Sequence, residues 1–321
     1  MAKITVVGSL NMDVVAVAPR IPVTGETIIG SKYFSEPGGK GANQAYAAAK
    51  LGGDVLMLGC IGDDDFGRKM RQNLSDVGCN AKNLRVAPGA SGVALIFVAE
   101  TGQNSIIVVP GANDKLLARH IKEDAAHLEG AGVVLLQLEN PMETVVAAAR
   151  EGCQRRARVI LDPAPAPVLP LPKELLSLVD ILTPNETEAA ILAGLPPGRL
   201  SPSEVQEIAR KLQAMGTANV IMKLGDQGCL LVERGSSKLI PAPTVNAVDT
   251  TAAGDVFNAG LAVGLAEGMD LANACRFAVH ASALSVTRLG TQIAVPSRIE
   301  VDEFTASSAG AGGSQFSNSG R

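Results

Sequence analysis

Short β-branched runs alternate with Ala- and Leu-rich segments of helical length along most of this 321-residue chain, and this alternation most constrains its fold. The expected strands are Ile4–Leu10, Asp54–Ile61, Val133–Leu138, Val159–Asp162, Asp180–Thr183, Val220–Leu224 and Cys229–Val232. Helices are expected at Ala42–Leu51, Pro141–Glu151 and Ser203–Met215. The pattern predicts an α/β fold with a doubly wound, mostly parallel sheet and helices on both faces. Ligands bind beyond the carboxyl ends of such strands, so functional residues are expected in the turns that follow them.

Two stretches break this alternation. Residues 14–36 read as extended segments with a turn at "PRIPVTGE", and Val93–Val109 reads as a hairpin folded at "ETGQN". With no helix between their strands, they are not expected in parallel crossover units. We expect a small β-sheet lid from about 11–37 and 91–111 on a main domain spanning 1–305. Its apolar face needs a cover, which a ligand, the main domain or a second subunit supplies.

Composition narrows the function classes. Net charge is −4 and aromatic residues make up 3% with no Trp, which argues against a nucleic-acid partner. The cysteines and histidines show neither disulfide nor metal-ligand spacing, and the N-terminal apolar stretch is too short for a signal peptide. No segment approaches membrane-spanning length, so we expect a cytoplasmic protein without a membrane partner. The last residues, 306–321, are low in bulky apolar groups and are expected to be disordered.

The stretch "VDTTAAGDVFNAGLAVGL", residues 248–265, places Asp255 where an apolar helix begins. One interpretation is a simple helix cap. The other uses the N–H groups of Ala252, Ala253 and Gly254 as an anion hole. Because a carboxylate repels a bare phosphate, Asp255 would then face a hydroxyl group and act as the general base of a phosphoryl transfer.

Three further stretches carry polar groups beside turns. "EPGGKGANQAYAAAKLG", residues 36–52, is not a Walker A loop, and it is either a glycine turn leading into a packed helix or a ligand loop that uses Lys40 and Asn43. "DILTPNETEAAIL", residues 180–192, places Asn185 and two acids after a strand, at the start of a helix. These residues either cap the helix, with Asn185 itself as the cap, or hold magnesium directly or through water. "KLGDQGC", residues 223–229, is explained equally well by a hairpin turn or a ligand loop.

Together these residues resemble the ribokinase-like sugar kinase superfamily over about residues 3 to 304. The motifs are "GSLNMD" at 8–13, "GGKGANQA" at 38–45, "QLENP" at 137–141, "TPNETEA" at 183–189 and "DTTAAGDVFNAG" at 249–260. The resemblance implies an α/β kinase domain with a β lid, a homodimer formed through the lids, and phosphorylation of ribose at its 5-hydroxyl by ATP with Mg²⁺.

The resemblance also implies site residues. The sugar would be bound by Asn11, Met12, Asp13, Gly39, Lys40, Gly41, Ala42, Asn43, Glu139 and Asp255. The nucleotide would contact Asn185, Glu188, Lys223, Leu224, Gly225, Asp226, Gln227, Gly228, Gly254, Asp255 and Val279, with Glu188 ordering the water shell of magnesium. An activating K⁺ would take oxygens from Asp249, Thr251, Ser285, Arg288, Gly290 and Ala294.

This chain departs from the family pattern at three places. Ala294 stands where serine is frequent and offers only a backbone oxygen to K⁺. Val279 and His280 stand where asparagine is frequent, which implies a relaxed preference for the nucleotide base. Lys223 replaces a frequent threonine and brings a positive charge that could meet the nucleotide phosphates.

Other functions stay open at this point. Within the same class, the sugar could be 2-deoxyribose, fructose or a nucleoside, although a nucleoside would want an aromatic slot that this chain scarcely provides. From a different class, the chain could be a non-catalytic sugar or nucleotide sensor. A dinucleotide oxidoreductase is disfavoured because the glycine fingerprint is missing.

Overall fold

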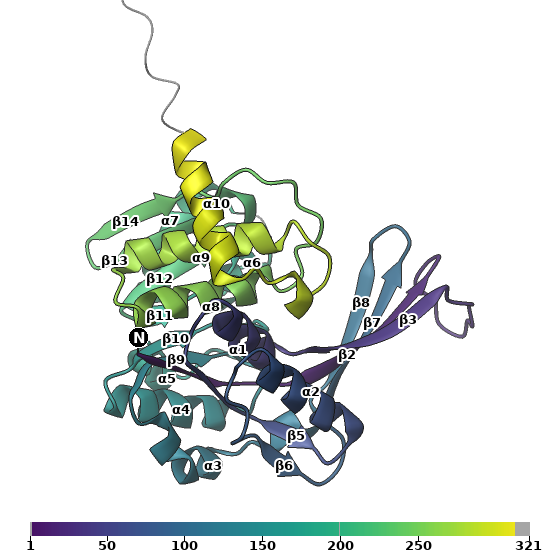
Figure 1. Cartoon of the computed structure of the whole chain (residues 1–321). Helices are drawn as coiled ribbons and strands as arrows, with labels where there is room; N and C mark the ends of the chain where they lie inside the picture. The colour runs from purple at the N-terminus through teal and green to yellow at the C-terminus, as the bar shows by residue number, and fades with distance from the viewer. Residues whose placement is uncertain (1, 199, 312–321) are drawn as a thin grey trace, which may run out of the picture.

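An eight-stranded sheet forms the centre of the protein in this computed structural model, which describes residues 2–198 and 200–311 (Figure 1). Its strand order is β14-β13-β12-β11-β10-β9-β1-β4. Pairs from β4 to β12 are parallel, and β12, β13 and β14 pair antiparallel. The prediction of a mostly parallel sheet is confirmed. The strands are β1 (Lys3–Val7), β4 (Val55–Leu58), β9 (Ala131–Leu136), β10 (Arg158–Leu161), β11 (Ile181–Leu182), β12 (Asn219–Lys223), β13 (Cys229–Glu233) and β14 (Ser236–Ile240).

Helices cover both faces of this sheet, as expected for a doubly wound fold. Alternate strand residues belong to different cores: Ile4 and Val6 pack on one face, and Val7 packs on the other. The first face is covered by α1 (Lys40–Lys50), α2 (Asp65–Asp76), α8 (Ala253–Ala266), α9 (Leu271–Ser285) and α10 (Arg298–Ala311). The second is covered by α3 (Ala118–Glu123), α4 (Met142–Gln154), α5 (Lys173–Leu178), α6 (Glu186–Leu192) and α7 (Pro202–Ala214).

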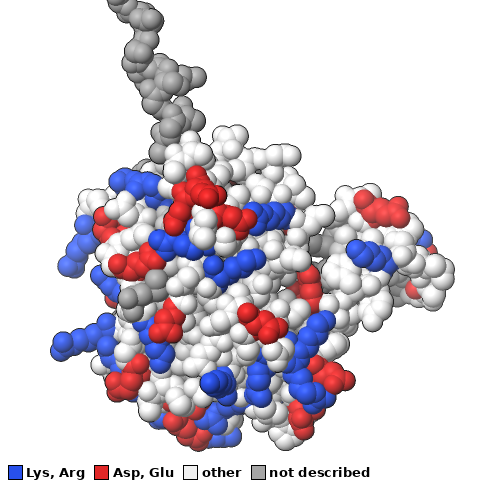
Figure 2. Space-filling view, viewed as in Figure 1, with Lys and Arg blue, Asp and Glu red and all other residues white. Residues whose placement is uncertain are grey.

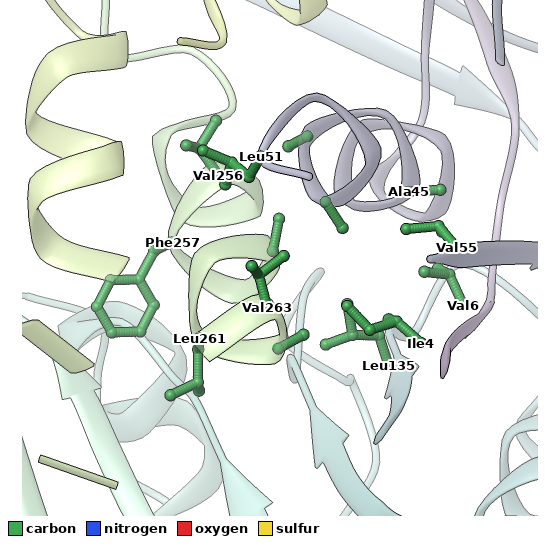
Figure 3. Close-up of a cluster of buried hydrophobic side chains, with 14 of the residues drawn as sticks. Ile4, Val6, Ala45, Leu51, Val55, Leu135, Val256, Phe257, Leu261 and Val263 are labelled. Carbon is green, nitrogen blue, oxygen red and sulfur yellow. The ribbon is translucent and has the colours of Figure 1, made fainter. Parts of the chain in front are cut away.

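The core on the first face forms where α1 and α8 pack together over the central strands. Figure 3 shows Val256 and Val263 of α8 and Leu51 after α1 in one buried cluster with Ile4 and Leu135 of the sheet. All of these side chains are buried, so water is excluded from the interface between the two helices and the sheet. The first turns of α1 and α8 are thereby held in fixed positions relative to the strands.

A second, four-stranded sheet projects from the body (Figure 1). Its order is β3 (Lys32–Gly38), β2 (Asn11–Ala18), β7 (Gly92–Ala99) and β8 (Asn104–Val109). The four strands fall within the segments 11–37 and 91–111, except that β3 ends one residue later, at Gly38; their role as a lid stays a prediction. The expectation that no parallel pairing occurs here is wrong, because β2 and β7 pair parallel. The chain reaches β7 only after returning through α1, β4 and α2, which supplies the crossover that a parallel pair requires.

Three other expectations need correction. The strand expected at Asp54–Ile61 divides at Gly59, and its second part, β5 (Cys60–Gly62), pairs with β6 (Arg85–Ala87) in a separate sheet. Strand β14 was not expected, because its sequence SSKLI is polar and lies at the sheet edge. Helix α10 extends to Ala311, so disorder from residue 306 is wrong for 306–311, which continue a helix already begun on buried Val301. Residues 312–321 lie outside the described part of the chain.

Among the helices that the structure describes, none combines the length and apolar character needed to cross a membrane.

Candidate active site

The candidate site lies at the carboxyl ends of β1, β9, β10, β11 and β12, where the turns after these strands meet the first turns of α1 and α8. Hydrogen bonds join side chains from several of these segments directly: Asn43 and Gln44 of α1 contact Asp255 of α8, and Gln44 contacts Asp162 after β10. Functional residues were expected in the turns after strands, and the structure brings them together there.

Asp255 is buried at the start of α8, with 5% of its surface exposed. Its Oδ2 accepts a hydrogen bond from Nδ2 of Asn43 at 3.1 Å, and its Oδ1 accepts one from Nε2 of Gln44 at 3.0 Å. No side chain caps α8. The interpretation of Asp255 as a simple helix cap is therefore wrong, because its oxygens point to α1 and not to the amides of its own helix.

The pKa of Asp255 suits a base that works near neutral pH. Burial raises the pKa to about 6, and the charge of Asp162 also raises it. The positive charge of Lys40 and the hydrogen bonds from Gln44 and Asn43 lower it, but burial outweighs them. At pH 7 the carboxylate is mostly ionised and able to accept a proton.

The backbone at the start of α8 has an unusual conformation. Ala252, which precedes the helix, has a φ of 56°, in the left-handed region that residues with a Cβ seldom adopt. Of the three amides expected to form an anion hole, that of Ala253 donates to the carbonyl of Thr250 at 3.3 Å. Those of Ala252 and Gly254 have no protein acceptor among the described residues. Such strain at a helix start with free donors is typical of a functional site.

The residues expected to bind sugar come from three segments. Glu139, after β9, accepts a hydrogen bond at Oε2 from the Ser9 hydroxyl at 2.5 Å and another from the Lys40 amide at 3.2 Å. Asn11 of β2 is buried, and its Oδ1 accepts a hydrogen bond from Nδ2 of Asn113 at 2.8 Å. This contact fixes the Asn11 amide so that its NH₂ group keeps one orientation.

Asp13 lies near this group on β2 and is also buried. Burial, followed by the charges of Glu36, Glu139 and Asp255, raises the pKa of Asp13 to about 7. At neutral pH this carboxyl group is therefore only partly ionised. A protonated carboxyl donates a hydrogen bond and an ionised one accepts, so Asp13 can meet a hydroxyl group in either way.

Lys40 provides positive charge among these acids. Burial lowers the pKa of Lys40, but the charges of Asp255, Asp162, Glu139 and Glu188 together raise it above its ordinary value. The ammonium group thus stays charged, and it offsets part of the repulsion among the carboxylates.

The glycines around Lys40 serve the packing of the protein backbone. Gly39 has a φ of 87°, and a Cβ on it would lie 2.6 Å from the amide nitrogen of Asn11. A Cβ on Gly41 would lie 2.5 Å from the amide nitrogen of Ser9. Both therefore let α1 start against the loop after β1, which supports the packed-turn interpretation of these two glycines. Met12 and Ala42, expected among the sugar ligands, place their side chains in the hydrophobic core.

Lys223, at the end of β12, extends the site toward the other residues expected to contact the nucleotide. Its Nζ donates to Oδ1 of Asp162 at 2.8 Å and lies 4.0 Å from Oε2 of Glu188. Glu188 forms a capping box with Asn185 at the start of α6, so the helix-cap interpretation of Asn185 is confirmed. Burial raises the pKa of Glu188, and the charge of Lys223 opposes that change. The 223–229 segment joins two antiparallel strands, which confirms the hairpin turn.

A cavity of about 430 Å³ opens beside Lys223 and the start of α8. Of the residues expected to contact the nucleotide, six line it: Lys223, Gly225, Asp226, Gly228, Gly254 and Val279. Asn185, Glu188, Leu224, Gln227 and Asp255 are not among its lining residues. Sequence reasoning did not assign ten other lining residues to the nucleotide: Ala242, Pro243, Thr244, Val245, Ala247, Thr250, Phe257, Ser282, Ala283 and Val286. These mostly small or apolar residues carry no chemical signature in the sequence.

The residues expected to bind K⁺ lie partly together beyond the α8 start. Asp249 Oδ1 accepts from the amide and the hydroxyl of Thr251, and Oδ2 accepts from the Gly290 amide at 3.0 Å. Burial raises the pKa of Asp249, but these hydrogen bonds outweigh it and hold the pKa below its ordinary value. The Ser285 hydroxyl donates to the Ser282 carbonyl, the Arg288 guanidinium pairs with Glu300, and Ala294 is buried. The described residues contain no cluster of three or more His, Cys, Asp or Glu side chains that could hold a metal.

Sequence reasoning missed several polar residues that connect the site: Ser9, Gln44, Asn113, Asp162 and Gln292. Gln44 follows Asn43 within the stretch that was singled out, and Asp162 ends an expected strand, so position alone was an available signal. Gln292 donates a hydrogen bond from its Nε2 to Oδ1 of Asn43 at 2.9 Å, and no sequence motif marks Gln292.

Comparison with known proteins identifies the family. The pattern of the pfkB family carbohydrate kinases matches residues 1–298. The chain is 41% identical to the ribokinase of Bacillus subtilis, over 95% of this chain and 99% of that protein, and 38% identical to the deoxyribokinase of Salmonella typhi, over 94% and 98%. The structure of Arabidopsis thaliana ribokinase complexed with ribose and ATP superposes with a TM-score of 0.88 at 34% identity, covering 94% of this chain and 98% of that one. On these grounds the chain belongs to the pfkB family of carbohydrate kinases.

Proposed function

We propose that this protein is a ribokinase that transfers the terminal phosphoryl group of ATP to the 5-hydroxyl of D-ribose. The observation that carries the proposal is the position of Asp255. This buried carboxylate lies in the first turn of α8, where Asn43 and Gln44 of α1 donate hydrogen bonds to it. The adjacent residue Gly254 lines the cavity. The B. subtilis and A. thaliana relatives, which are ribokinases, support the assignment.

In the proposed reaction, Asp255 accepts the proton of the sugar hydroxyl as the oxygen attacks phosphorus. The free amides of Ala252 and Gly254 stabilise negative charge on the transferring group. Asn43 and Gln44 hold the Asp255 carboxylate in one orientation before the sugar arrives, so little reorganisation accompanies the reaction. A sensor would gain nothing from an ionised base placed beside free amides.

Two cations accompany this proposal. Magnesium supplies charge neutralisation to the nucleotide phosphates, and Glu188 would order its water shell. Glu188 fits this indirect role because Asn185 already donates to both of its oxygens. For K⁺, the anionic Asp249 would supply charge and backbone carbonyls the other oxygens, because the side chain of Ala294 offers none.

Ribose is the proposed sugar because the polar groups are numerous and fixed. Asn11, Asp13, Asn43 and Glu139 offer both donors and acceptors to a polyol. A site that hydrogen-bonds the 2-hydroxyl rejects the 2-deoxy sugar, since its partners would be left unpaired. The S. typhi relative is a deoxyribokinase, so 2-deoxyribose is the comparison that matters most.

We also propose a cytoplasmic homodimer that forms through the second sheet. All five cysteines are free, and four of them are buried, which suits a reducing compartment. Several apolar side chains of β8 are exposed on a sheet that stands away from the body (Figure 1). A second copy of the chain would cover them.

The test is an ADP-release assay with MgATP on D-ribose, 2-deoxy-D-ribose, D-fructose and adenosine, run in potassium and in sodium salts. We expect the highest kcat/KM with ribose and a higher rate in potassium. A higher kcat/KM with 2-deoxyribose would replace the proposed substrate, and equal rates in the two salts would remove the K⁺ site. No turnover with any sugar would leave a binding protein on this fold.

A further inference from the structure

Asp162 is a buried carboxylate that the proposed reaction does not yet use. It follows β10, with 2% of its side chain exposed, and both of its oxygens are engaged. Oδ1 accepts from the ammonium group of Lys223 at 2.8 Å, and Oδ2 accepts from Nε2 of Gln44 at 3.1 Å. A buried ion pair of this kind is costly to desolvate and adds little stability by itself.

The two partners of Asp162 contact different parts of the site: Lys223 lies at the cavity, and Gln44 lies at Asp255. Lys223 lines the cavity, and a Cβ added to Gly254 would lie 3.3 Å from its Nζ. Its ammonium group therefore lies at the start of α8, next to an amide without a protein acceptor. Gln44, on the other side, donates from the same Nε2 to Asp255 at 3.0 Å.

Gln44 is itself held in one orientation. It is fully buried, and its Oε1 accepts a hydrogen bond from Nε2 of Gln137 at 2.6 Å. Since Oε1 is committed to a donor, the NH₂ group must face Asp162 and Asp255. A single buried chain thus runs from Lys223 through Asp162 and Gln44 to Asp255.

We propose that Asp162 is a positioning residue for phosphoryl transfer: it anchors the Lys223 ammonium where the terminal phosphates of the nucleotide lie and, through Gln44, orients the Asp255 carboxylate. This inference rests on the proposed kinase function and adds to it the coupling between the phosphate-binding cation and the base. Lys223 then brings a fixed positive charge to the developing negative charge of the transferring group.

Replacing Asp162 with asparagine tests this role because an amide has only one acceptor. If Oδ1 of the new asparagine still accepts the hydrogen bond from Lys223, its NH₂ group faces the NH₂ group of Gln44, and two donors meet without an acceptor. We expect kcat to fall about 10- to 100-fold, as for loss of a charge-assisted hydrogen bond, and KM for ATP to rise. The matched control is Asp180→Asn, at the opposite end of β10 and β11, where the carboxylate accepts the amide of Val159.

A pH profile separates positioning from a merely structural role. Asp255 is surrounded by charges from Lys40 of α1, Asp13 of β2 and Asp162, and the charge of Asp162 raises the pKa of Asp255. In Asp162→Asn the acidic midpoint of kcat/KM for ribose should therefore move to lower pH, whereas Asp180→Asn should leave it in place. A structural defect would lower the thermal midpoint without moving the pH midpoint.

Lys223→Met provides a second variant should Asp162→Asn fail to fold. It leaves Asp162 and Gln44 in place, so KM for ATP should rise while KM for ribose stays within about twofold. If the wild type phosphorylates ribose but Asp162→Asn keeps wild-type kcat, KM for ATP and pH midpoint, the inference is overturned and the kinase function stands. The same holds if Lys223→Met leaves KM for ATP unchanged. A wild type inactive on every sugar would instead overturn the proposed function.

Discussion

At the scale of single residues, the site stores charge in places where water cannot reach it. Asp255 has an ordinary pKa of 3.8 and one of about 6 in the folded protein, chiefly because of burial. The folded protein therefore favours the neutral form of Asp255, and ionisation lowers the free energy of unfolding. The stabilising contribution of the neutral carboxyl is fully present below about pH 4 and is lost as the pH rises through about 6. The same burial that lowers stability near neutral pH gives Asp255 a pKa at which its carboxylate can accept a proton.

Asp255→Asn tests both sides of this relation. Turnover of ribose should fall by about 10²- to 10⁴-fold, the range for loss of a general base. Between pH 5 and pH 7.5 the wild type should lose roughly 1–2 kcal/mol more unfolding free energy than the variant, because only the wild type ionises at this position.

Urea denaturation at the two pH values, beside ADP-release kinetics, measures these effects. The difference between the two proteins isolates Asp255 from Asp13 and Glu188, whose pKa values are raised in the same direction. Parallel stability curves would show that Asp255 titrates normally, and wild-type turnover would remove it as the base.

Sequence reasoning found the residues whose chemistry is visible in local motifs. Asp255, Asn43 and Glu139 each lie in a quoted motif, and the structure joins the first two. Asp162 escaped because its meaning depends on Lys223, 61 positions away, and on Gln44, 118 positions away. A single sequence, taken by itself, carries no trace of such pairings. The free amide of Gly254 was inferred from its place at an expected helix start, whereas the bond that occupies the Ala253 amide depends on the backbone angles of the turn.

At the scale of elements, the position of α8 decides where Asp255 and the free amides lie. Helices α8 and α9 approach closely because small residues line their contact. A Cβ on Gly260 would lie 2.9 Å from Cα of Ala278, and one on Gly264 would lie 3.0 Å from Cα of Ala274. The neighbouring atoms are backbone, so they cannot move aside without separating the helices.

Gly260→Val should force α8 away from α9 and destabilise the fold by about 1–3 kcal/mol, as overpacking does in other cores. Because Asp255 lies on the same helix, kcat should also fall, while KM for ATP changes less. The control is Gly198→Val, where an added Cβ meets nothing within 4 Å. Thermal denaturation and kinetics on both variants test this. Equal stability of the two variants would mean that α8 and α9 tolerate a larger separation.

Element prediction succeeded where periodicity was strong and failed at edges and junctions. The parallel strands β1, β9 and β10 are mostly apolar and rich in β-branched residues, and they were recognised. The break between β4 and β5 was not, because apolar residues continue across it and only Gly59 marks the bend. The parallel pairing of β2 with β7 joins strands far apart in the sequence, and a local pattern cannot reveal that.

At the scale of the whole molecule, the body and the projecting sheet differ in the charged groups that they present on the face shown in Figure 2. On the face shown in Figure 2, basic and acidic residues are interspersed, and the projecting sheet carries few charged groups. Its edge strand β8 exposes Ile106, Ile107, Val108 and Val109. An apolar edge strand with unpaired backbone groups invites association, so a defined partner protects the protein from disordered aggregation.

Ile107→Asp tests whether a second copy supplies that cover. Ile107 is 57% exposed and pairs with Leu95 in the middle of β8. We expect the wild type to sediment as a dimer, and the variant as a monomer, because the new carboxylate would be buried without a partner in the interface. Leu239→Asp is the matched control: Leu239 is 53% exposed on β14, the edge strand of the main sheet, and its change should leave the dimer intact. A monomeric wild type, or a dimer unaffected by Ile107→Asp, would mean that the second sheet is covered by something other than its own copy.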